Sequence, residues 1–330
     1  MDKIRLGLPK GSLNTIGRAD THELFVDAGF EIRGYEPGEE SDDRLRIVND
    51  PRIIAYLARP QSAPVELITG LLDIAIIGED WVQEETVNGK RSEVRRVGDL
   101  EYGGTRLVAA ISNELPYESL SELFEGLRDR QTPIICFTEY VNLTRGFFMR
   151  NEAYRQRFGD QKPLVRVRGF TDGENDLVRI IHSDGVTEGF IAKGADIVVD
   201  NSQTGSSLRR YGLKELEQIM KSSAGLYAGP SCVSWKEQKA QQIFEQLYGV
   251  IVGKRYFDVK FNVPNERLEE LRGYLTSEKL YSAEPTIITG ERFSQVNILI
   301  PKEGFPETLT ALKSYGAQDV VRGEVKQVVR

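Results

Sequence analysis

The stretch RIIAYLARPQSAPVELITGLLDIAIIG, residues 52–78, decides the fold class. Residues 52–59 have the length and apolar content of a strand, and the spacing of apolar residues at 63–72 predicts a helix. Residues 73–78 form a continuous apolar run, as in strands that are buried on both faces of a sheet. This alternation of strand, helix and strand predicts an α/β protein with a parallel sheet.

The same alternation extends in both directions along the chain. Upstream, we expect a strand at 3–8 and a helix at 13–30; downstream, we expect strands at 105–112, 133–137, 164–170 and 195–200 with helices at 117–129 and 142–158. Residues 212–234 are expected to return to the first lobe before a helix at 236–253. Two α/β lobes joined by crossing segments predict a cleft, where small ligands usually bind.

The last part of the chain has a different rhythm. Strand patterns at 255–264, 285–289, 293–301 and 319–329 alternate with helical patterns at 265–275 and 305–317. The order βαββαβ is the ferredoxin-like arrangement. We therefore expect three parts: lobe I at 1–105 plus 205–250, lobe II at 106–204, and a third domain at 254–330, which is either an oligomerisation module or a regulatory ligand-binding domain.

Composition excludes several classes of function. The chain of 330 residues is 40% hydrophobic and 28% charged with a net charge of -7, which argues against disorder and against a basic surface for nucleic acid. Cys136 and Cys232 lack metal-ligand spacing, and no segment has the pattern of a signal peptide or a membrane span. We expect a soluble, cytoplasmic protein that binds neither nucleic acid nor membranes.

The two histidines do not indicate hydrolytic chemistry. His22 is expected on a helix, and His182 ends a helical pattern at 175–185, where its charge would favour the helix dipole. Neither lies near a nucleophile motif, so a catalytic triad is a poor interpretation. Both histidines are expected to be structural.

The stretch DIVVDNSQTGSSL, residues 196–208, carries the clearest functional signal. A strand runs directly into a loop of small polar residues, and such a loop can bind phosphate through backbone N–H groups and the start of the next helix. Thr204, Ser206 and Ser207 supply hydroxyls, and Gly205 lets the backbone approach a ligand closely. Asp200 could accept hydrogen bonds from ribose hydroxyls. The alternative is a polar turn with a helix N-cap.

Residues 200–208 resemble the phosphoribosyl-diphosphate (PRPP) loop of ATP phosphoribosyltransferases, in which Asp is followed by Thr-Gly-x-Thr-Leu. Further motifs resemble that family in order along nearly the whole chain: LGLPKGSL (6–13), DRLRI (43–47), ARP (58–60), GLLDIAIIGEDWVQE (70–84), LEYGGTRL (100–107), TEYVNLTR (138–145) and GVTE (185–188). The ferredoxin-like tail is similar to the regulatory domain of the long form.

The resemblance implies a fold, a reaction and partners. The fold would be a two-lobed core like that of periplasmic binding proteins, followed by an ACT-like regulatory domain. The reaction would be the first step of histidine biosynthesis, in which N1 of ATP displaces pyrophosphate from C1 of PRPP, with Mg²⁺ as cofactor and histidine as allosteric inhibitor. The long form of the family is hexameric. A different nucleophile, or a relative without this activity that serves as a regulatory or solute-binding protein, stays open as an alternative.

The resemblance also assigns roles to individual residues. Arg59 and Arg44 are the candidates for stabilising the leaving pyrophosphate. The expected PRPP-binding residues are Glu188, Asp200, Thr204, Gly205, Ser206, Ser207 and Lys10. Glu101 and Tyr140 are expected at the ATP site, although Tyr140 could equally pack in the core. No residue is assigned as a protein ligand of a metal.

Four features depart from the family pattern. Ser12 stands where the family often has a longer side chain, and Ser207 replaces the last Thr of the loop while keeping its hydroxyl. The spacing from Glu188 to Asp200 is one residue shorter. Residues 171–185 are expected to form an inserted helix, and Glu174 within it is a rival for the role given to Glu188.

Overall fold

The computed structural model describes residues 2–17, 19–41, 45–86, 94–277 and 284–329. The chain divides into two compact units. The first unit comprises residues 1–21, 34–46 and 51–237, and the second comprises residues 22–33, 47–50 and 238–330. Helix α8 (Trp235–Gly253) begins in the first unit and continues into the second.

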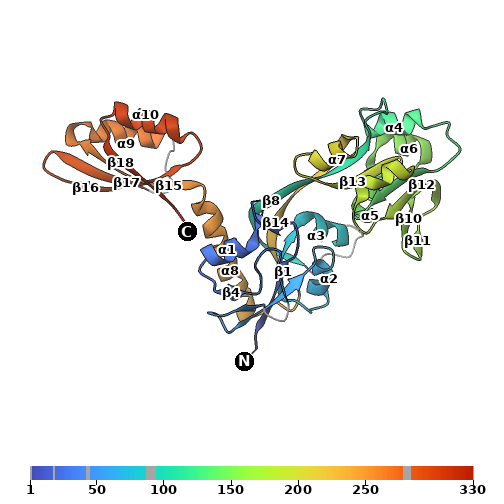
Figure 1. The fold of residues 1–330 in the computed structure, drawn as a ribbon, viewed down its shortest axis with the longest axis horizontal. Coiled ribbons are helices and arrows are strands. Elements are labelled where there is room, and N and C mark those ends of the chain that lie inside the picture. The colour runs from blue at the N-terminus through green and yellow to red at the C-terminus, as the bar shows by residue number, and fades with distance from the viewer. Residues whose placement is uncertain (1, 18, 42–44, 87–93, 278–283, 330) are drawn as a thin grey trace. The chain divides into compact units, whose positions relative to one another are not determined.

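A ten-stranded mixed sheet organises the first unit, in the order β11-β10-β12-β9-β13-β8-β14-β7-β1-β6 (Figure 1). Its strands are β1 (Ile4–Pro9), β6 (Ile53–Ala58), β7 (Ile74–Gly78), β8 (Arg95–Ser112), β9 (Ile134–Thr138), β10 (Pro163–Val167), β11 (Phe170–Asp172), β12 (Asn175–His182), β13 (Ile197–Ser202) and β14 (Leu213–Ala228). Strand β1 pairs in parallel with β6 and β7, and β9 pairs in parallel with β12 and β13. The predicted α/β class with parallel strands is confirmed.

The two long strands β8 and β14, of 18 and 16 residues, pair with each other antiparallel in the middle of the sheet. Each also pairs antiparallel with its other neighbour, β8 with β13 and β14 with β7. The strand predicted at 105–112 is the end of β8, and the returning segment predicted at 212–234 contains β14 at Leu213–Ala228. These two strands connect both groups of parallel strands. One sheet thus runs through the whole unit.

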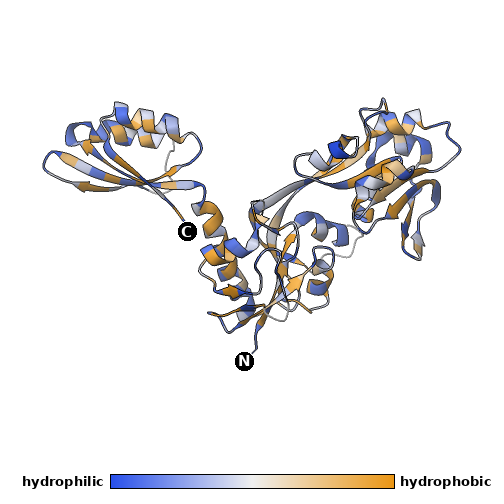
Figure 2. Ribbon diagram, viewed as in Figure 1, coloured by the Kyte–Doolittle hydropathy of each residue, from blue (hydrophilic) through white to orange (hydrophobic). Residues whose placement is uncertain are grey.

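Short helices accompany this sheet. They are α2 (Ala63–Ile68), α3 (Glu79–Thr86), α4 (Leu120–Gly126), α5 (Val141–Arg150), α6 (Glu152–Phe158), the 3-10 helix η1 (Thr187–Lys193) and α7 (Ser206–Arg210). Figure 1 shows α4, α5 and α6 beside the strands β10 and β12, and α2 and α3 beside β1. The apolar residues gather in the strands and on the helix faces that meet them (Figure 2), and Phe124, Phe148 and Tyr154 pack their rings together in this core.

The helix predicted at 171–185 is wrong, because residues Asn175–His182 form strand β12 inside the sheet. Val178 and Ile180 are fully buried on one face, which is the two-residue period of a strand. His182 consequently lies opposite Thr138 in a parallel pair and ends no helix. The β-branched residues at 178, 180 and 181 are the signal that favoured a strand.

The helix predicted at 13–30 is much shorter in the structure. Residues Asn14–Thr15 (β2) and Ala19–Asp20 (β3) form a small antiparallel hairpin, and only Thr21–Asp27 form helix α1. Gly17 has a positive φ of 76°, which breaks a helix. The Asn14 side chain donates to the Tyr35 carbonyl oxygen at 3.1 Å, which holds this turn in place.

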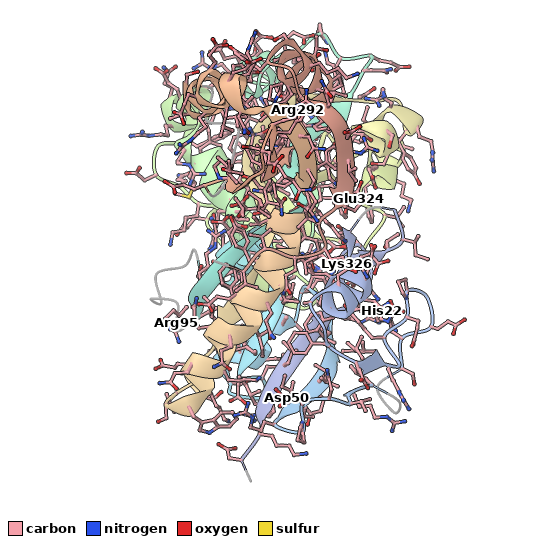
Figure 3. All side chains as sticks on the ribbon, turned by 90° about the vertical axis from the view of Figure 1, so that its left-hand side faces the viewer. His22, Asp50, Arg95, Arg292, Glu324 and Lys326 are labelled. Carbon is pink, nitrogen blue, oxygen red and sulfur yellow. The ribbon has the colours of Figure 1, made fainter. Side chains whose placement is uncertain are left out.

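The ferredoxin-like tail is confirmed in the second unit. A four-stranded antiparallel sheet has the order β16-β17-β15-β18, formed by Thr286–Thr289, Phe293–Pro301, Tyr256–Pro264 and Gln318–Glu324. The 3-10 helix η2 (Asn265–Arg267), α9 (Leu268–Ser277) and α10 (Phe305–Ser314) complete the βαββαβ order. Figure 3 labels Glu324, the last residue of β18, and Lys326 just after it.

The second unit also contains elements from early in the chain. These are helix α1, strand β4 (Ile32–Arg33) and the end of strand β5 (Arg46–Ile47). Lys254, just after α8, forms an ion pair with Asp27 of α1 at 3.0 Å, and Lys239 of α8 forms another with Asp50 at 2.5 Å. Figure 3 labels Asp50 and His22, which both belong to the second unit. Among the described helices, none is both long and apolar enough to cross a bilayer.

Asp73, fully buried between β1 and the start of β7, fixes this end of the sheet. Its carboxylate accepts hydrogen bonds from the Arg5 side chain at 2.8 Å, from Ser231 Oγ at 2.7 Å and from Lys236 Nζ at 3.1 Å. Burial alone would raise the pKa of Asp73, but these hydrogen bonds lower it to about 2.

We predict that Asp73→Asn lowers the free energy of unfolding by about 3 kcal/mol at pH 7, because Arg5 and Lys236 lose their buried counter-charge. Since the folded pKa lies below the unfolded value, this stabilisation is present above about pH 4 and is lost as the pH falls to about 2. Urea unfolding at pH 7 and pH 3 measures both effects.

The matched control is Asp2→Asn, which removes a carboxylate 3.6 Å from the same Lys236 but one that is 70% exposed. It should change the free energy of unfolding by less than about 0.5 kcal/mol. A loss for Asp73→Asn that is no larger than that of the control, or that is independent of pH, would contradict this assignment.

Candidate functional site

A pocket of about 230 Å³ lies where the carboxyl ends of β7 and β13 approach β8 and β14. It is lined by Ser12, Leu13, Pro60, Gly78, Asp80, Trp81, Gly103, Thr105, Asn201, Gln203, Thr204, Gly205, Ser206, Ser207, Ser222, Ser223 and Ala224. Open α/β sheets commonly bind ligands outside the carboxyl ends of their strands. The four residues of the predicted phosphate loop, 204–207, all line this pocket.

The loop after β13 is held in a conformation that requires glycine. Gly205 has a φ of 69°, and a Cβ atom there would lie 2.9 Å from Arg209 Nη1. The loop hydroxyls are close together, with Thr204 Oγ1 donating to Ser206 Oγ at 3.1 Å. Helix α7, five residues long, starts at Ser206. The hydroxyls and backbone N–H groups of this loop are the groups that an anionic ligand needs.

Asp80 forms the floor of the pocket and was not predicted from the sequence. It is 3% exposed, and its carboxylate accepts hydrogen bonds from Ser222 Oγ at 2.6 Å and from Tyr140 Oη at 2.7 Å. Asn201 Nδ2 donates to the same carboxylate at 3.0 Å and also contacts the Tyr140 hydroxyl. The sequence signal was its place two residues after the apolar strand at 73–78, at the carboxyl end of that strand.

Tyr140 lies behind the pocket wall. It is 1% exposed, and its ring packs on Trp81 with the centroids 4.3 Å apart. Burial, and then the neighbouring Asp80 carboxylate, raises the pKa of Tyr140. The packing interpretation of Tyr140 therefore describes its ring, while its hydroxyl supports Asp80.

The Asp200 carboxyl lies close to two other acids. Its own burial is the main reason that the pKa of Asp200 rises to about 7, and the charges of Glu188 and Glu139 raise it further. Hydrogen bonds from the Asn201 N–H, at 2.7 Å, and from the Thr187 side chain act in the opposite direction. The structure thus brings together Asp200 and Glu188, and it adds Glu139, which the sequence analysis missed.

Lys10 and Arg59 occupy neighbouring strand ends. Lys10 follows β1 and donates its N–H to the Ala58 carbonyl oxygen at 3.1 Å, and Arg59 follows Ala58 at the end of β6. Both side chains are exposed, and neither lines the pocket, although Pro60, next to Arg59, and Ser12, two residues after Lys10, do. Arg44 lies outside the described residues.

Glu101 and Glu174 do not line the pocket. Glu101 has a positive φ of 54° and donates its N–H to Asp99 Oδ1 at 2.8 Å, so it lies at an irregularity of strand β8, where the pairing register with β14 shifts. Glu174 Oε2 accepts a hydrogen bond from the Lys162 N–H at 3.0 Å, in the turn before β12. This contact of Glu174 stabilises the turn and does not reach the pocket.

A second buried carboxylate, Glu84 of α3, anchors helix α5. Glu84 is 4% exposed and accepts hydrogen bonds from the N–H groups of Asn142, at 2.8 Å, and Leu143, at 2.9 Å. N–H groups of a first helical turn have no acceptor within their own helix, so Glu84 caps α5 from a neighbouring element. Burial raises the pKa of Glu84 to about 7.

Metal ligands are not pre-assembled at the site. Across the described part of the chain, no group of three or more His, Cys, Asp or Glu side chains is arranged to hold a metal ion. Asp200 and Glu188 supply two carboxylates near each other, which is fewer than a protein-only cage requires.

Comparison with known proteins identifies the family. Residues 59–249 match the family model "ATP phosphoribosyltransferase", and residues 253–327 match the C-terminal domain model of the same family. An ATP phosphoribosyltransferase of Pelotomaculum thermopropionicum is 29% identical, and one of Desulforudis audaxviator is 28% identical, each over 99% of both chains. A chain of the ATP phosphoribosyl transferase (HisG:HisZ) complex from Thermotoga maritima aligns with 74% of this chain and 96% of its own length, at 20% identity and a TM-score of 0.49.

We predict that Asp200→Asn stabilises the protein at pH 8, because it removes a buried charge. The folded pKa of about 7 lies above the unfolded value of about 4, so the folded state holds the proton longer and stability falls as the pH rises through this range. At pH 8 the free energy of unfolding should rise by up to about 4 kcal/mol, because one pKa unit corresponds to about 1.4 kcal/mol, and at pH 4 it should not change.

Denaturant unfolding at both pH values measures this effect, with Asp160→Asn, in the exposed turn after α6, as the control that should leave stability unchanged. Equal stability of Asp200→Asn and the unsubstituted protein at pH 8 would show that Asp200 carries no buried charge.

Proposed function

The chain belongs to the ATP phosphoribosyltransferase family, and we propose that it transfers the phosphoribosyl group of PRPP to N1 of ATP. The lone pair of adenine N1 forms the new bond to C1 of the ribose. The bond from C1 to the diphosphate oxygen breaks, and its electron pair leaves with pyrophosphate. The products are phosphoribosyl-ATP and pyrophosphate.

The observation that carries this proposal is the position of the loop 203–207. Its hydroxyls and backbone line the pocket at the carboxyl end of β13, and they face a wall that includes Asp80 and Ser222. A group with an anionic end and a polar sugar suits this combination of donors and carboxylates. We infer that the loop binds the 5′-phosphate of PRPP.

Asp200 and Glu188 are proposed to accept hydrogen bonds from the ribose hydroxyls. They lie on β13 and η1, next to the phosphate loop along the chain. An ionised carboxylate accepts stronger hydrogen bonds than a neutral one, so a pKa of about 7 for Asp200 makes sugar binding sensitive to pH near neutrality. Carboxylates near C1 also favour the positive charge that develops on the ribose in the transition state.

Arg59, Lys10 and Arg44 are proposed to stabilise the leaving pyrophosphate. Arg59 and Lys10 stand on adjacent strand ends beside the pocket-lining residues Pro60 and Ser12. Charge builds on the diphosphate as the bond to C1 breaks, and fixed cations lower the energy of that state. The reaction needs no protein base, since adenine N1 already carries its lone pair.

Tyr140 was expected at the ATP site, and we infer that it acts instead through its neighbours in the pocket wall. Its side chain is almost fully enclosed, so it supports Trp81 and Asp80, which do line the pocket. Glu101 is exposed at the register irregularity of β8 and is kept as a candidate for orienting the nucleotide.

Mg²⁺ fits the site as an ion that enters with the diphosphate. It usually keeps several waters and takes one or two protein carboxylates together with substrate phosphates. Asp200 and Glu188 are the described carboxylates that would hold it. When bound, Mg²⁺ neutralises charge on the leaving group.

Regulation, assembly and location are proposed from the family resemblance. Histidine would bind to the ferredoxin-like domain in the second unit and inhibit the enzyme, which requires two global states with different affinities for histidine. A hexamer could supply these states. The reaction belongs to histidine biosynthesis, and we place the enzyme in the cytoplasm.

The direct test is to mix the purified protein with ATP, PRPP, Mg²⁺ and a pyrophosphatase, with and without histidine, and to look for phosphoribosyl-ATP by mass spectrometry. We expect product that decreases when histidine is added. Absence of product with PRPP still binding would indicate another nucleophile or a regulatory relative, and unchanged product with histidine would remove the regulatory proposal alone.

We predict that Arg59→Ala lowers kcat/KM for PRPP by about 100-fold, which corresponds to about 2.7 kcal/mol of transition-state stabilisation. Stability should change little because the side chain is exposed. The control is Arg292→Ala, at an exposed turn of the second unit (Figure 3), which removes the same charge and should leave turnover unchanged. Unchanged turnover for Arg59→Ala would exclude this residue from the mechanism.

A further inference from the structure

A bidentate ion pair lies beneath the phosphate loop and has no role in the reaction as proposed so far. Arg106 of β8 donates to both carboxylate oxygens of Glu215 of β14, at 2.6 and 2.8 Å. Ser202, the last residue of β13, donates its hydroxyl to the same carboxylate at 3.0 Å. Ser202 is 2% exposed and the Glu215 side chain is 31% exposed, so this hydrogen bond is partly buried, just where the loop begins.

The register of the sheet explains why these three side chains meet. Arg106 stands directly opposite Ser202 in the antiparallel pair of β8 with β13. Glu215 stands opposite Ala110, four residues from Arg106 along β8 and therefore on the same face of the sheet. Three neighbouring strands thus each contribute one group to a single cluster below the loop.

The loop backbone rests on this cluster. A Cβ atom at Gly205 would lie 3.2 Å from Glu215 Oε1, so the Glu215 carboxylate fills the space next to that glycine. Arg209 also approaches this position, with Nη1 2.9 Å from the same Cβ position, and its Nη2 donates to the Thr204 carbonyl oxygen at 2.9 Å. The Glu215 and Arg209 side chains therefore both limit the path of the backbone at Thr204–Gly205.

Contacts from other elements must hold the loop, because its own residues do little to fix its backbone conformation. Its residues are small, Gly205 has a positive φ, and the short helix α7 has no side-chain cap at its start. A loop that is not ordered before binding must be ordered by the ligand, which weakens affinity. A preformed loop avoids that cost.

We propose that Arg106, Glu215 and Ser202 are positioning residues, which hold the loop 203–206 in its phosphate-binding conformation before PRPP arrives. This inference rests on the proposed function of the loop. Arg106 has a second effect in the same cluster, because it neutralises a carboxylate that would otherwise repel a bound phosphate. The hydrogen bond from Arg106 is also the main reason why the pKa of Glu215 is lowered.

The test compares Glu215→Gln and Ser202→Ala with the unsubstituted protein. Both substitutions break the cluster of Arg106, Glu215 and Ser202, which we call the clamp. KM and Kd for PRPP should rise by about tenfold for Glu215→Gln and less for Ser202→Ala. KM for ATP should stay unchanged, and kcat should fall less than twofold. Titration calorimetry with PRPP gives Kd without turnover. Hydrogen exchange of the backbone amides at 203–206, in the absence of ligand, should become faster.

The matched control is Glu118→Gln, which breaks an ion pair to Lys214, the neighbour of Glu215 on β14, at 2.6 Å but away from the loop. It should change none of these quantities. The double variant Arg106→Glu with Glu215→Arg restores a pair of opposite charges and should recover part of the PRPP affinity.

The outcomes separate the two proposals. If the unsubstituted protein makes no phosphoribosyl-ATP and does not bind PRPP, the proposed function fails, and faster exchange at 203–206 in Glu215→Gln would still show that the clamp holds the loop. Unchanged exchange and unchanged PRPP affinity in a folded Glu215→Gln would overturn the clamp. Should Glu215→Gln not fold, Ser202→Ala removes only one hydroxyl and decides the question by the same measurements.

Discussion

The antiparallel pairing of β8 with β14 is the constraint on which the first unit depends. These two strands are the neighbours that join the parallel strands of β7, β1 and β6 to those of β13, β9 and β12. Their pairing sets Thr105 opposite Ser222, and both line the pocket. It also places Arg106 and Glu215 on one face below the phosphate loop. The pocket wall and the support of the loop therefore follow from one register.

Buried polar groups then fix the site around this frame. Asp80 joins α3, β14, α5 and β13 through hydrogen bonds from Ser222, Tyr140 and Asn201. Burying a carboxylate costs free energy, and so does removing any of the donors that satisfy it. Such a group therefore specifies one arrangement of the elements that meet there. Asp200, by contrast, keeps a raised pKa next to other acids, and a group that destabilises the free protein is typical of a binding site.

The sequence predicted most of the strands and the polar loop after β13, because continuous apolar runs and small polar residues after a strand are local signals. The binding of phosphate by that loop stays a proposal. The prediction failed at 171–185, because the charged residues among Val178, Ile180 and Ile181 gave this segment a spacing of apolar residues like that of a helix. The segment is a strand, and its pairing with β9 and β10 holds it in the sheet. The prediction also missed Asp80, Glu139 and Glu215, whose roles come from partners more than 60 residues away or from other strands. Such partners are set by register, and register is not visible in the local pattern.

The central claim is that the loop 203–207 and the floor at Asp80 form the PRPP site. Hydrogen exchange of the unsubstituted protein with and without PRPP and Mg²⁺, read by mass spectrometry, tests it most directly. We expect PRPP to slow exchange at 202–208 and at the start of α3, near Asp80, while the ferredoxin-like sheet of the second unit stays unchanged. Binding of PRPP with unchanged exchange at both of these segments would contradict the account.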